Sequence, residues 1–343
     1  MKHIGMDLHS TTTDFTVRNS EGVIVKRKQV RSTRTELVKF ISSIPGSKRV
    51  MVEESQMADW VARALIPHVD EFIRCQPQHN DLISKSEDKY DRQDADNLSK
   101  LLYLNEFKGV HHPEWIFHQL REGVRAYWYA SYEVTRAKNR LKAFFLFNGI
   151  HCVGPSVFSK RGRESFYEKL KECSGDVELV RILFKRLDQN REMRAMHVKL
   201  LGELAKPVET EVRCLKSIPG IGIIAAYTLV ALLERGMRFR NKRRLWKYCG
   251  LAIRRHESRG IGTQGASHSG NRHAKRVLMI AVASLVKCKR DHNALTKLWH
   301  QGRDRQINPS RLRRNLARKI AVLAQQLLRS KEMYDDARLM TMS

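Results

Sequence analysis

The chain of 343 residues carries 64 Lys and Arg against 36 Asp and Glu, and its formal net charge of +28 indicates a polyanionic partner. With 42% hydrophobic residues it can build the cores of two or three domains, which excludes a disordered tail. Six scattered cysteines without a CxxC pair signal neither a zinc site nor a disulfide framework, and no apolar run approaches the roughly 20 residues of a membrane span.

The positive charge is unevenly distributed along the chain. Residues 1–108 hold 17 Lys and Arg and 16 Asp and Glu, so nearly all of the excess lies in residues 109–343. We therefore expect a near-neutral N-terminal domain whose acids do not bind phosphate directly, followed by basic regions that do. Because no signal peptide opens the sequence, we expect a cytoplasmic protein with no membrane partner.

The N-terminal residues predict a mixed sheet. Residues 2–19 predict a strand, a turn and a second strand, and residues 21–30 predict a third strand. The elements expected after them are a helix (33–44), a strand (49–54), a helix (57–68) and a strand (71–76). This order, followed by helices, is similar to that of an RNase H-like, or RuvC-like, nuclease domain, and it predicts an α/β fold for residues 1–108.

Acidic residues stand near the ends of these apolar strands. Asp7 directly follows Ile-Gly-Met in the first strand, and Glu54 ends the strand VMVEE. Asp91 and Asp94 are three residues apart and project from one face if a helix has begun there. In an RNase H-like sheet these positions converge, and four acids at one point would repel one another without divalent cations between them. The pattern therefore predicts Mg²⁺ or Mn²⁺ held by Asp7, Glu54, Asp91 and Asp94, as a pair of ions about 4 Å apart.

From Trp115 onward the pattern becomes that of a long helix. Residues recur at alternating spacings of three and four, which is typical of a heptad seam that packs against a partner helix. The seam consists of Phe117, Leu120, Val124, Tyr127, Ser131, Val134, Lys138, Leu141 and Phe145. Residues 165–214 predict a second helical stretch that can supply the partner. Residues 109–212 are therefore expected to form a coiled-coil dimerisation arm, or alternatively an ordinary helical bundle.

Residues 213–343 predict a mainly helical C-terminal domain with a glycine turn near its start. The sequence SIPGIG places Gly220 and Gly222 ahead of an apolar helix and resembles a helix-hairpin-helix element. Glycine amides in such a turn can approach a DNA phosphate without side-chain obstruction. A purely structural turn would use the same glycines, so the sequence leaves both interpretations open.

Residues 235–276 carry thirteen basic residues against one acid, Glu257. One interpretation of this segment is a solvated basic loop. Another is the setting of a serine nucleophile, because arginines would offset the charge of a phosphodiester and glycines would let a strand come close. Ser258, Ser267 and Ser269 all lie in the segment, and spacing alone does not choose among them.

Two signatures in the chain resemble those of the insertion-sequence-110 family of transposases, which is related to the Piv DNA invertases. The stretches IGMDLH, VEES and KYDRQDADNL, with Asp7, Glu54, Asp91 and Asp94, look like the DEDD signature of that family. The stretch GLAIRRHESRGIGTQGASHSGNRHAKRVL, preceded by SIPGIG, looks like its second signature. The resemblance covers nearly the whole chain in the family's order.

The chain departs from the family's pattern after the fourth strand. The family commonly has Glu-Ala-Thr-Gly there, whereas this chain has Glu-Ser-Gln-Met beginning at Glu54. The adjacent Glu53 is therefore an alternative ligand. Asp96 adds a further acid beside the expected helical pair and is a reserve candidate.

The resemblance implies a DNA recombinase of a mobile element whose catalytic serine is Ser258. It implies that the carboxylate site and the serine act together to cut and exchange donor and target DNA through a transient phosphoserine link. It also implies a noncoding bridge RNA that pairs with both DNAs, and a homodimer or homotetramer whose composite site joins domains of different protomers. The expected setting is a bacterial or archaeal cytoplasm, with nucleoid association when DNA is bound.

The residues expected to contact nucleic acid are Arg254, Arg255, Arg259, Gly220, Gly222, Arg272, Lys275 and Arg276. The base that takes the serine proton is left open among His256, a metal-bound hydroxide and water. The alternatives to a serine recombinase are a RuvC-like metal-dependent nuclease or junction resolvase without a covalent serine intermediate, a site-specific DNA invertase, and a non-catalytic nucleic-acid architectural protein.

Overall fold

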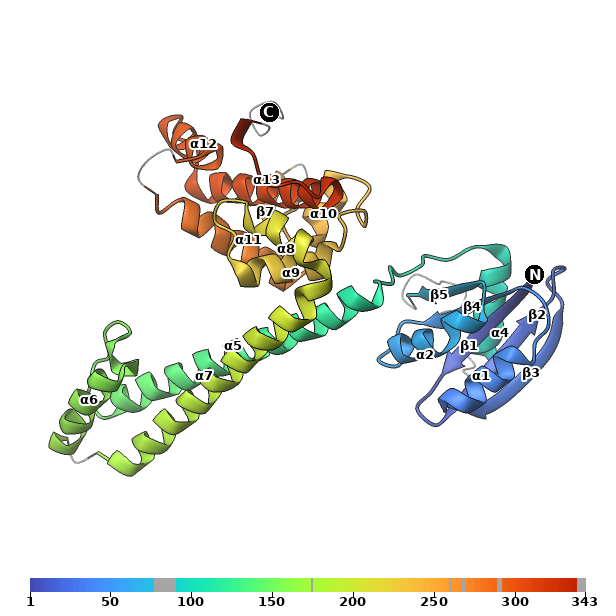
Figure 1. The fold of residues 1–343 in the computed structure, drawn as a ribbon, viewed down its shortest axis with the longest axis horizontal. Helices are drawn as coiled ribbons and strands as arrows, with labels where there is room; N and C mark the ends of the chain where they lie inside the picture. The colour runs from blue at the N-terminus through green and yellow to red at the C-terminus, as the bar shows by residue number, and fades with distance from the viewer. Residues whose placement is uncertain (77–90, 174, 259–260, 267–268, 289–291, 338–343) are drawn as a thin grey trace. The chain divides into compact units, whose positions relative to one another are not determined.

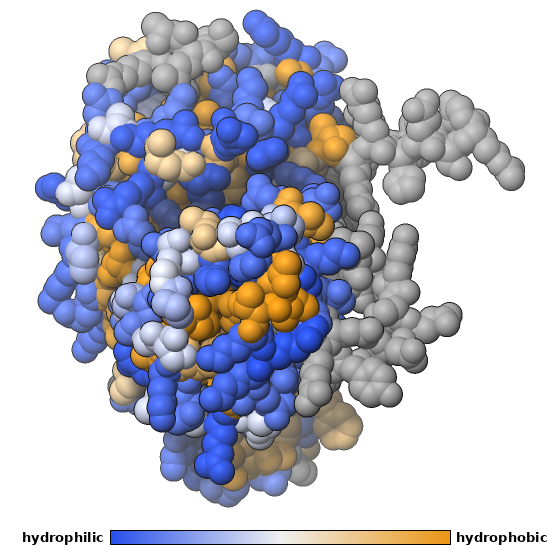
Figure 2. Space-filling view, turned by 90° about the vertical axis from the view of Figure 1, so that its right-hand side faces the viewer, coloured by the Kyte–Doolittle hydropathy of each residue, from blue (hydrophilic) through white to orange (hydrophobic). Residues whose placement is uncertain are grey.

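The chain folds into two compact units, Met1–His112 and Pro113–Ser343, shown in Figure 1. The structure is a computed structural model that describes residues 1–76, 91–173, 175–258, 261–266, 269–288 and 292–337. Side chains at 91–93, 160, 254–258 and 261–266 lie outside this description. Among the described residues, no helix combines the length and the apolarity that a membrane span needs. On the face seen in Figure 2, hydrophilic side chains predominate and apolar ones form separate patches.

A five-stranded mixed sheet in the order β3-β2-β1-β4-β5 forms the first unit. The strands β1 (Lys2–Leu8), β2 (Thr12–Arg18) and β3 (Ile24–Arg31) form an antiparallel meander. The strands β4 (Lys48–Glu53) and β5 (Glu71–Cys75) continue the sheet parallel to β1. This mixed α/β start, followed by a mostly helical region, is consistent with the predicted RNase H-like order.

Helices cover both faces of this sheet, so its central strands are apolar on both sides. The helices α1 (Arg34–Ser42) and α2 (Ala58–Leu65) pack on one face, together with Val50 and Val52 of β4. The helix α4 (Asp91–Leu104) packs on the other face, together with Met51. At Gly5 of β1 a Cβ atom would collide with the Ala95 carbonyl of α4, so the glycine lets this helix lie close against the sheet.

Two long helices form an arm in the second unit. The helix α5 (Trp115–Phe147) packs along α7 (Val177–Ala205), and α6 (Lys160–Glu172) joins them at the far end. Near one end Phe117 and Leu120 share a core with Leu201 and Ala205, and near the other end the core includes Phe145. The two helices are therefore antiparallel, and α7 lies within the range predicted to supply the partner.

The buried face of α5 follows the predicted seam except at three positions. Tyr127, Ser131 and Lys138 are only partly buried, whereas Trp128 and Ala137 are buried beside them. The prediction of a paired helix agrees with the structure, but three of its contact residues were assigned one position away from the core.

The C-terminal helices pack around the apolar helix α9 (Ile223–Leu233). The others are α8 (Glu209–Lys216), α10 (Lys242–Tyr248), α11 (Arg272–Leu285), α12 (Ala294–Asp304) and α13 (Pro309–Ser330). Their core is continuous with the near end of the arm, because α5 residues such as Val124 belong to the same cluster. Packing therefore does not test the predicted division into residues 109–212 and 213–343, which stays a prediction.

Asparagine side chains set the starts of the last four helices. The caps are Asn241, Asn271, Asn293 and Asn308, and each side chain accepts a hydrogen bond from the first turn of its helix. These bonds satisfy backbone N–H groups that have no partner inside the helix. The helix boundaries around the basic segment are thus fixed by local sequence.

Candidate active site

The first predicted acid, Asp7, lies on β1 in the face that α4 covers. Residues alternate between the two faces of a strand, so Asp7 shares the face of Gly5, against which α4 packs. Its side chain is only 13% exposed, and its Oδ2 lies 2.8 Å from Nε2 of His9. Across the antiparallel pair it stands opposite Asp14, whose side chain is buried and accepts a hydrogen bond from Gln29.

Asp14 was not singled out from the sequence. The signal was present, because strand alternation in TTDFTVR places Asp14 on the same face as Thr16, which binds a side chain of α4. The sequence alone does not distinguish this acid from the other polar residues of the strand, because the strand also carries threonines and an arginine.

Glu53 is the acid at the end of β4 that interacts with Asp7. It follows Val52 and shares the face of Met51, which α4 covers. Burial raises the pKa of Glu53, and the negative charges of Asp94 and Asp7 raise it further. Asp94 and Asp7 are therefore close enough to Glu53 to affect its ionisation.

Glu54, predicted as the ligand at this position, has different surroundings. Its side chain is 40% exposed, and Oε2 lies 3.6 Å from Nη1 of the buried Arg74. The same guanidinium donates a 2.6 Å hydrogen bond to Asp59 of α2. The geometry therefore favours Glu53 over Glu54 as the β4 contributor to the carboxylate cluster.

The helix α4 supplies the remaining acids. Asp91 is its first residue and Asp94 lies one turn later, so both occur where the sequence placed a helix start. Asp94 is partly buried and is the charge that acts most strongly on Glu53. The Asp91 side chain lies outside the described residues. Among those that the structure describes, no group of three or more His, Cys, Asp or Glu is arranged as a ready metal site.

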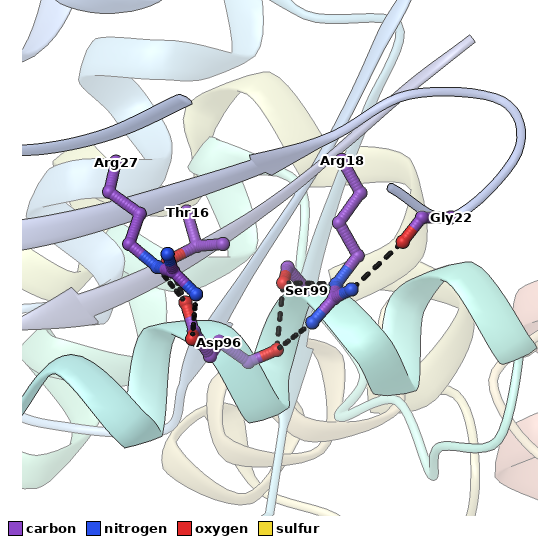
Figure 3. A network of polar contacts seen from close by, with 6 residues as sticks. All are labelled: Thr16, Arg18, Gly22, Arg27, Asp96 and Ser99. Atoms are coloured by element: carbon purple, nitrogen blue, oxygen red, sulfur yellow. Dashed lines mark hydrogen bonds and ion pairs between the residues drawn. The ribbon is translucent and has the colours of Figure 1, made fainter. Parts of the chain in front are cut away.

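Asp96, the reserve candidate, is engaged in a structural network shown in Figure 3. Thr16 donates a 2.5 Å hydrogen bond to Oδ1, and Arg27 donates to both carboxylate oxygens at 2.9 and 2.7 Å. The backbone carbonyl of Asp96 accepts hydrogen bonds from Ser99 and Arg18. Burial alone would raise the pKa of Asp96, but the hydrogen bonds from Arg27 and Thr16 outweigh it and lower the pKa. Asp96 thus fastens α4 to β2 and β3 and is not available as a metal ligand.

We expect Asp96→Asn to destabilise the first unit by about 1–3 kcal/mol, because it removes charge-assisted hydrogen bonds to a partly buried carboxylate. The lowered pKa means that this stabilisation is complete at neutral pH and is lost as the pH falls through the folded-state value. Denaturant unfolding at pH 7 and pH 3 measures it. An equal difference between wild type and variant at both pH values would contradict the assignment.

In the second unit Ser258 ends a strand of a β-hairpin. The strand β6 (Ile253–Ser258) pairs antiparallel with β7 (Ile261–Ala266), and Ser258 stands opposite Ile261 beside the connecting residues. The hairpin was not predicted from the sequence. The side chains of Arg254, Arg255, His256 and Ser258 lie outside the described residues, as do the predicted contact Arg259 and the competing Ser267. Ser269 is described and exposed.

Two glycines close the base of this hairpin. Gly250 has a φ of +64° and Gly270 a φ of +121°, a region that side-chain-bearing residues rarely adopt. A Cβ atom on Gly270 would lie 2.6 Å from the backbone nitrogen of Gly250. The chain entering the hairpin and the chain leaving it therefore approach more closely than any other residue type would allow.

We expect Gly270→Ala to destabilise the second unit by at least about 1–3 kcal/mol, because it combines backbone strain with a backbone clash. Gly154→Ala is the control, since its φ of +72° is also positive but no atom lies within 4 Å of the added Cβ. The midpoint of thermal unfolding measures both variants. Equal midpoints would show that the close approach of the two glycines is not needed for folding.

The helix α11 carries three predicted nucleic-acid contacts. Arg272 is exposed, whereas the guanidinium of Arg276 lies 4.4 Å from the ring centroid of Trp128 in α5. Trp128 also stacks on His273, whose pKa is lowered by burial and by the charge of Arg276. Arg276 therefore joins α11 to the arm, while Arg272 and the partly buried Lys275 have no such stacking contact among the described residues.

The two glycines of the predicted turn have different surroundings. Gly220, with a φ of +85°, packs so tightly that a Cβ atom would lie 2.6 Å from the Ala281 carbonyl of α11. Gly222 is the N-cap residue of α9, and nothing lies within 4 Å of its Cβ position. Packing explains Gly220, and Gly222 keeps the open approach expected of a phosphate contact.

Comparison with protein families gives two matches. A family model described as Transposase, of the DEDD group named for IS110, matches residues 4–148 and spans the acids of β1, β4 and α4. A model described as Transposase IS116/IS110/IS902 family matches residues 212–297 and spans the glycine turn and the β6–β7 hairpin. A comparison with curated proteins finds no significant match.

Proposed function

The chain belongs to the IS110 family of transposases, and from this we propose that it recombines donor and target DNA of an insertion sequence with two cooperating groups of residues. The first group is the carboxylate cluster of the N-terminal unit. The second is Ser258 on the β6–β7 hairpin. The observation that carries the proposal is the environment of Glu53, whose pKa is raised by burial and then by the negative charges of Asp94 and Asp7, because a half-buried acid with two acidic neighbours is typical of a site rather than a solvated surface.

The donor set of the cluster fits a divalent cation. Asp7, Glu53 and Asp94 present only carboxylate oxygens, the ligand type that Mg²⁺ prefers, and their repulsion is the kind that a cation relieves. Asp91 would complete the set from the first turn of α4. When bound, Mg²⁺ would polarise the phosphodiester and stabilise the charge that develops on it. His9 would orient the Asp7 carboxylate through its 2.8 Å contact.

Ser258 would act as the nucleophile. Its Oγ would give its proton to a base and form a bond to phosphorus. The bond from phosphorus to one deoxyribose oxygen would break, and that oxygen would leave as a hydroxyl after taking a proton. The product would be a phosphoserine link that a second strand reverses during exchange. Arginines in the surrounding segment, including Arg254, Arg255 and Arg259, would offset the negative charge of the transition state.

A noncoding bridge RNA would select the two DNAs by base pairing. The support is the charge distribution, because the excess outside the near-neutral N-terminal unit can hold two polyanions at once. Arg272 and Lys275 of α11 and the open turn at Gly222 are contacts for phosphate under this proposal.

A recombination assay tests the function as a whole. Purified protein, the transcript that flanks its gene, and donor and target plasmids would be incubated with Mg²⁺, and recombinants would be scored by sequencing the new junctions. We expect junctions only when RNA and Mg²⁺ are both present. Equal recombination without RNA would contradict the RNA-guided mechanism. DNA cleavage without any junctions would favour a metal-dependent nuclease or resolvase.

A homo-oligomer is supported by the outer face of the arm. Five residues of α7 occupy positions of one heptad series on the side away from α5, with Arg186 and Gln189 at the two positions between them. All five are at least 44% exposed: Leu179, Ile182, Met193, Met196 and Leu200. We expect Ile182→Glu with Met196→Glu to lower the mass measured by light scattering to that of a smaller species. Lys185→Glu with Lys199→Glu, at other exposed positions of α7, is the control. An unchanged mass in both variants would place the contact elsewhere.

A further inference from the structure

A groove between α10 and α13 is separate from every residue assigned above. Its volume is about 670 Å³, within the range of roughly 300–1,000 Å³ that ligand pockets occupy. The lining residues are Lys242, Trp246, Asn315, Arg318, Lys319, Val322, Leu323 and Gln326. Three of these are cations, two are amides and none is an acid, so the groove suits an anionic ligand with an apolar part.

The apolar part of the lining, here called the floor of the groove, consists of Trp246, Val322 and Leu323. Trp246 is partly buried and packs with Val322 against the core, beside the buried Leu323. The indole N–H of Trp246 donates to the backbone carbonyl of Arg318 at 3.3 Å, and the Arg318 guanidinium lies 5.1 Å from the ring centroid. The orientation of the ring is therefore fixed before any ligand binds, as in an aromatic platform for stacking.

Two lysines, Lys242 and Lys319, supply positive charge at the rim of the groove. Within the part of the chain that the structure describes, neither Lys242 nor Lys319 forms an ion pair with a carboxylate. The ammonium of Lys242 lies 5.9 Å from the Trp246 ring centroid, so a phosphate bound there would lie beside the aromatic floor. Arg318 is already occupied, because its Nε donates to the Leu251 carbonyl at 2.8 Å.

Two further contacts define the ligand. Gln326 lines the groove, and its Oε1 is buried without a hydrogen-bond partner among the described atoms. A buried acceptor of this kind gains from a ligand N–H, which nucleobases carry on their edges. Leu251, which Arg318 holds, comes two residues before β6, so the groove is fastened to the strand that carries Ser258.

We propose that this α10–α13 groove binds one unpaired nucleotide of a nucleic-acid strand. The base lies on the Trp246 platform with its edge toward Gln326, and the flanking phosphates contact Lys242 and Lys319. A paired and stacked base cannot offer its face to the ring, so the groove selects a single strand over a duplex. The inference rests on the proposed function only in taking nucleic acid as the partner.

The first test measures affinity in EDTA, where no cleavage occurs. Fluorescence anisotropy would give dissociation constants of the full-length protein for a single-stranded DNA, the RNA of the same sequence and the DNA duplex. We expect Lys242→Gln with Lys319→Gln to weaken single-strand binding about tenfold and to reduce the salt slope by about 1.4, the value for two lost phosphate contacts. Duplex binding should change less than twofold or so. The control is Arg243→Gln with Arg244→Gln, exposed cations of α10 that do not line the groove.

The second test locates the base. Single strands with 5-iodouracil at one position would be photo-crosslinked to the wild-type protein, and the crosslinked peptides would be identified by mass spectrometry. We expect the tryptic peptide Leu245–Lys247, which contains Trp246, and we expect Trp246→Leu to lose that crosslink while its unfolding midpoint confirms a folded protein. The relative yield from DNA and RNA would show which strand occupies the groove.

The groove proposal is wrong if both lysine pairs weaken binding equally and no crosslink reaches Trp246. It is also wrong if duplex and single strand respond alike to the groove variant. These outcomes are independent of recombination, because both measurements are made without Mg²⁺. A protein that binds through the groove but forms no junctions would refute the proposed function and leave the groove intact.

Discussion

Replacing Glu53 with Gln should reduce strand cleavage and recombination by at least about 100-fold, because even residues that only support a metal ligand cost 10–100-fold. Glu54→Gln should leave both activities within about threefold of wild type, since Glu54 faces Arg74 and solvent. The pair is matched, because the two substitutions are identical in chemistry and adjacent in sequence. Initial rates of cleavage of end-labelled donor DNA at saturating Mg²⁺ would measure the difference.

The raised pKa of Glu53 gives a second measurement on the same variants. Without a cation, the folded N-terminal unit holds the Glu53 proton more tightly than the unfolded chain does. Its stability therefore falls as the pH rises through the raised value, and Glu53→Gln should remove this part of the pH dependence. Added Mg²⁺ should stabilise wild type more at pH 8 than at pH 5. If Glu54→Gln rather than Glu53→Gln removed the effect, the ligand would be Glu54.

Ser258→Ala should abolish the covalent protein–DNA adduct and lower recombination by at least about 10⁴-fold, the scale on which loss of a covalent nucleophile acts in other enzymes. Donor and target DNA, end-labelled and incubated with protein, RNA and Mg²⁺, would be run on a denaturing gel. A labelled band that migrates with the protein is expected for wild type and should be absent from the variant.

Ser269→Ala is the matched control for this experiment, because Ser269 is an exposed serine of the same basic segment. It should retain the adduct. Loss of the adduct in Ser269→Ala alone would identify Ser269 rather than Ser258 as the nucleophile. Cleaved DNA without an adduct in any lane would assign the chemistry to the carboxylates and leave the hairpin as a surface that holds the strand.

The order of strands and helices in the first 76 residues could be predicted because each element has a strong local pattern. Strand-forming stretches separated by turns predicted the meander of β1, β2 and β3, and short apolar runs predicted β4 and β5. The choice between Glu53 and Glu54 could not be made in the same way. The β4 strand is apolar on both faces, so its sequence does not show which residues face α4, and a shift by one residue exchanges the two faces.

The β6–β7 hairpin was missed for a different reason. Its strands are rich in Arg, Gly, Gln and Thr, so no apolar alternation marks them as strands. The signals that define the hairpin are the positive-φ glycines at its base and the Asn271 cap of α11, which act through the backbone. The groove likewise depends on the packing of α10 against α13. Between the first residue of α10, Lys242, and the first residue of α13, Pro309, lie 66 residues, and local sequence patterns do not show that such distant segments pack together.

The stacking of Arg276 and His273 on Trp128 connects the arm to the helix that follows the serine segment. The hairpin strand β7 ends at Ala266 and α11 begins at Arg272. The stack connects the first turns of α11 to α5. Helix geometry puts the end of α5 at Phe147 roughly 28 Å from Trp128. A helix resists bending, so a partner that holds the end of the arm also fixes the tilt of α5 beneath α11. In the proposed homo-oligomer, a contact on the arm would therefore be connected to the hairpin through α5 and α11, without touching the hairpin itself.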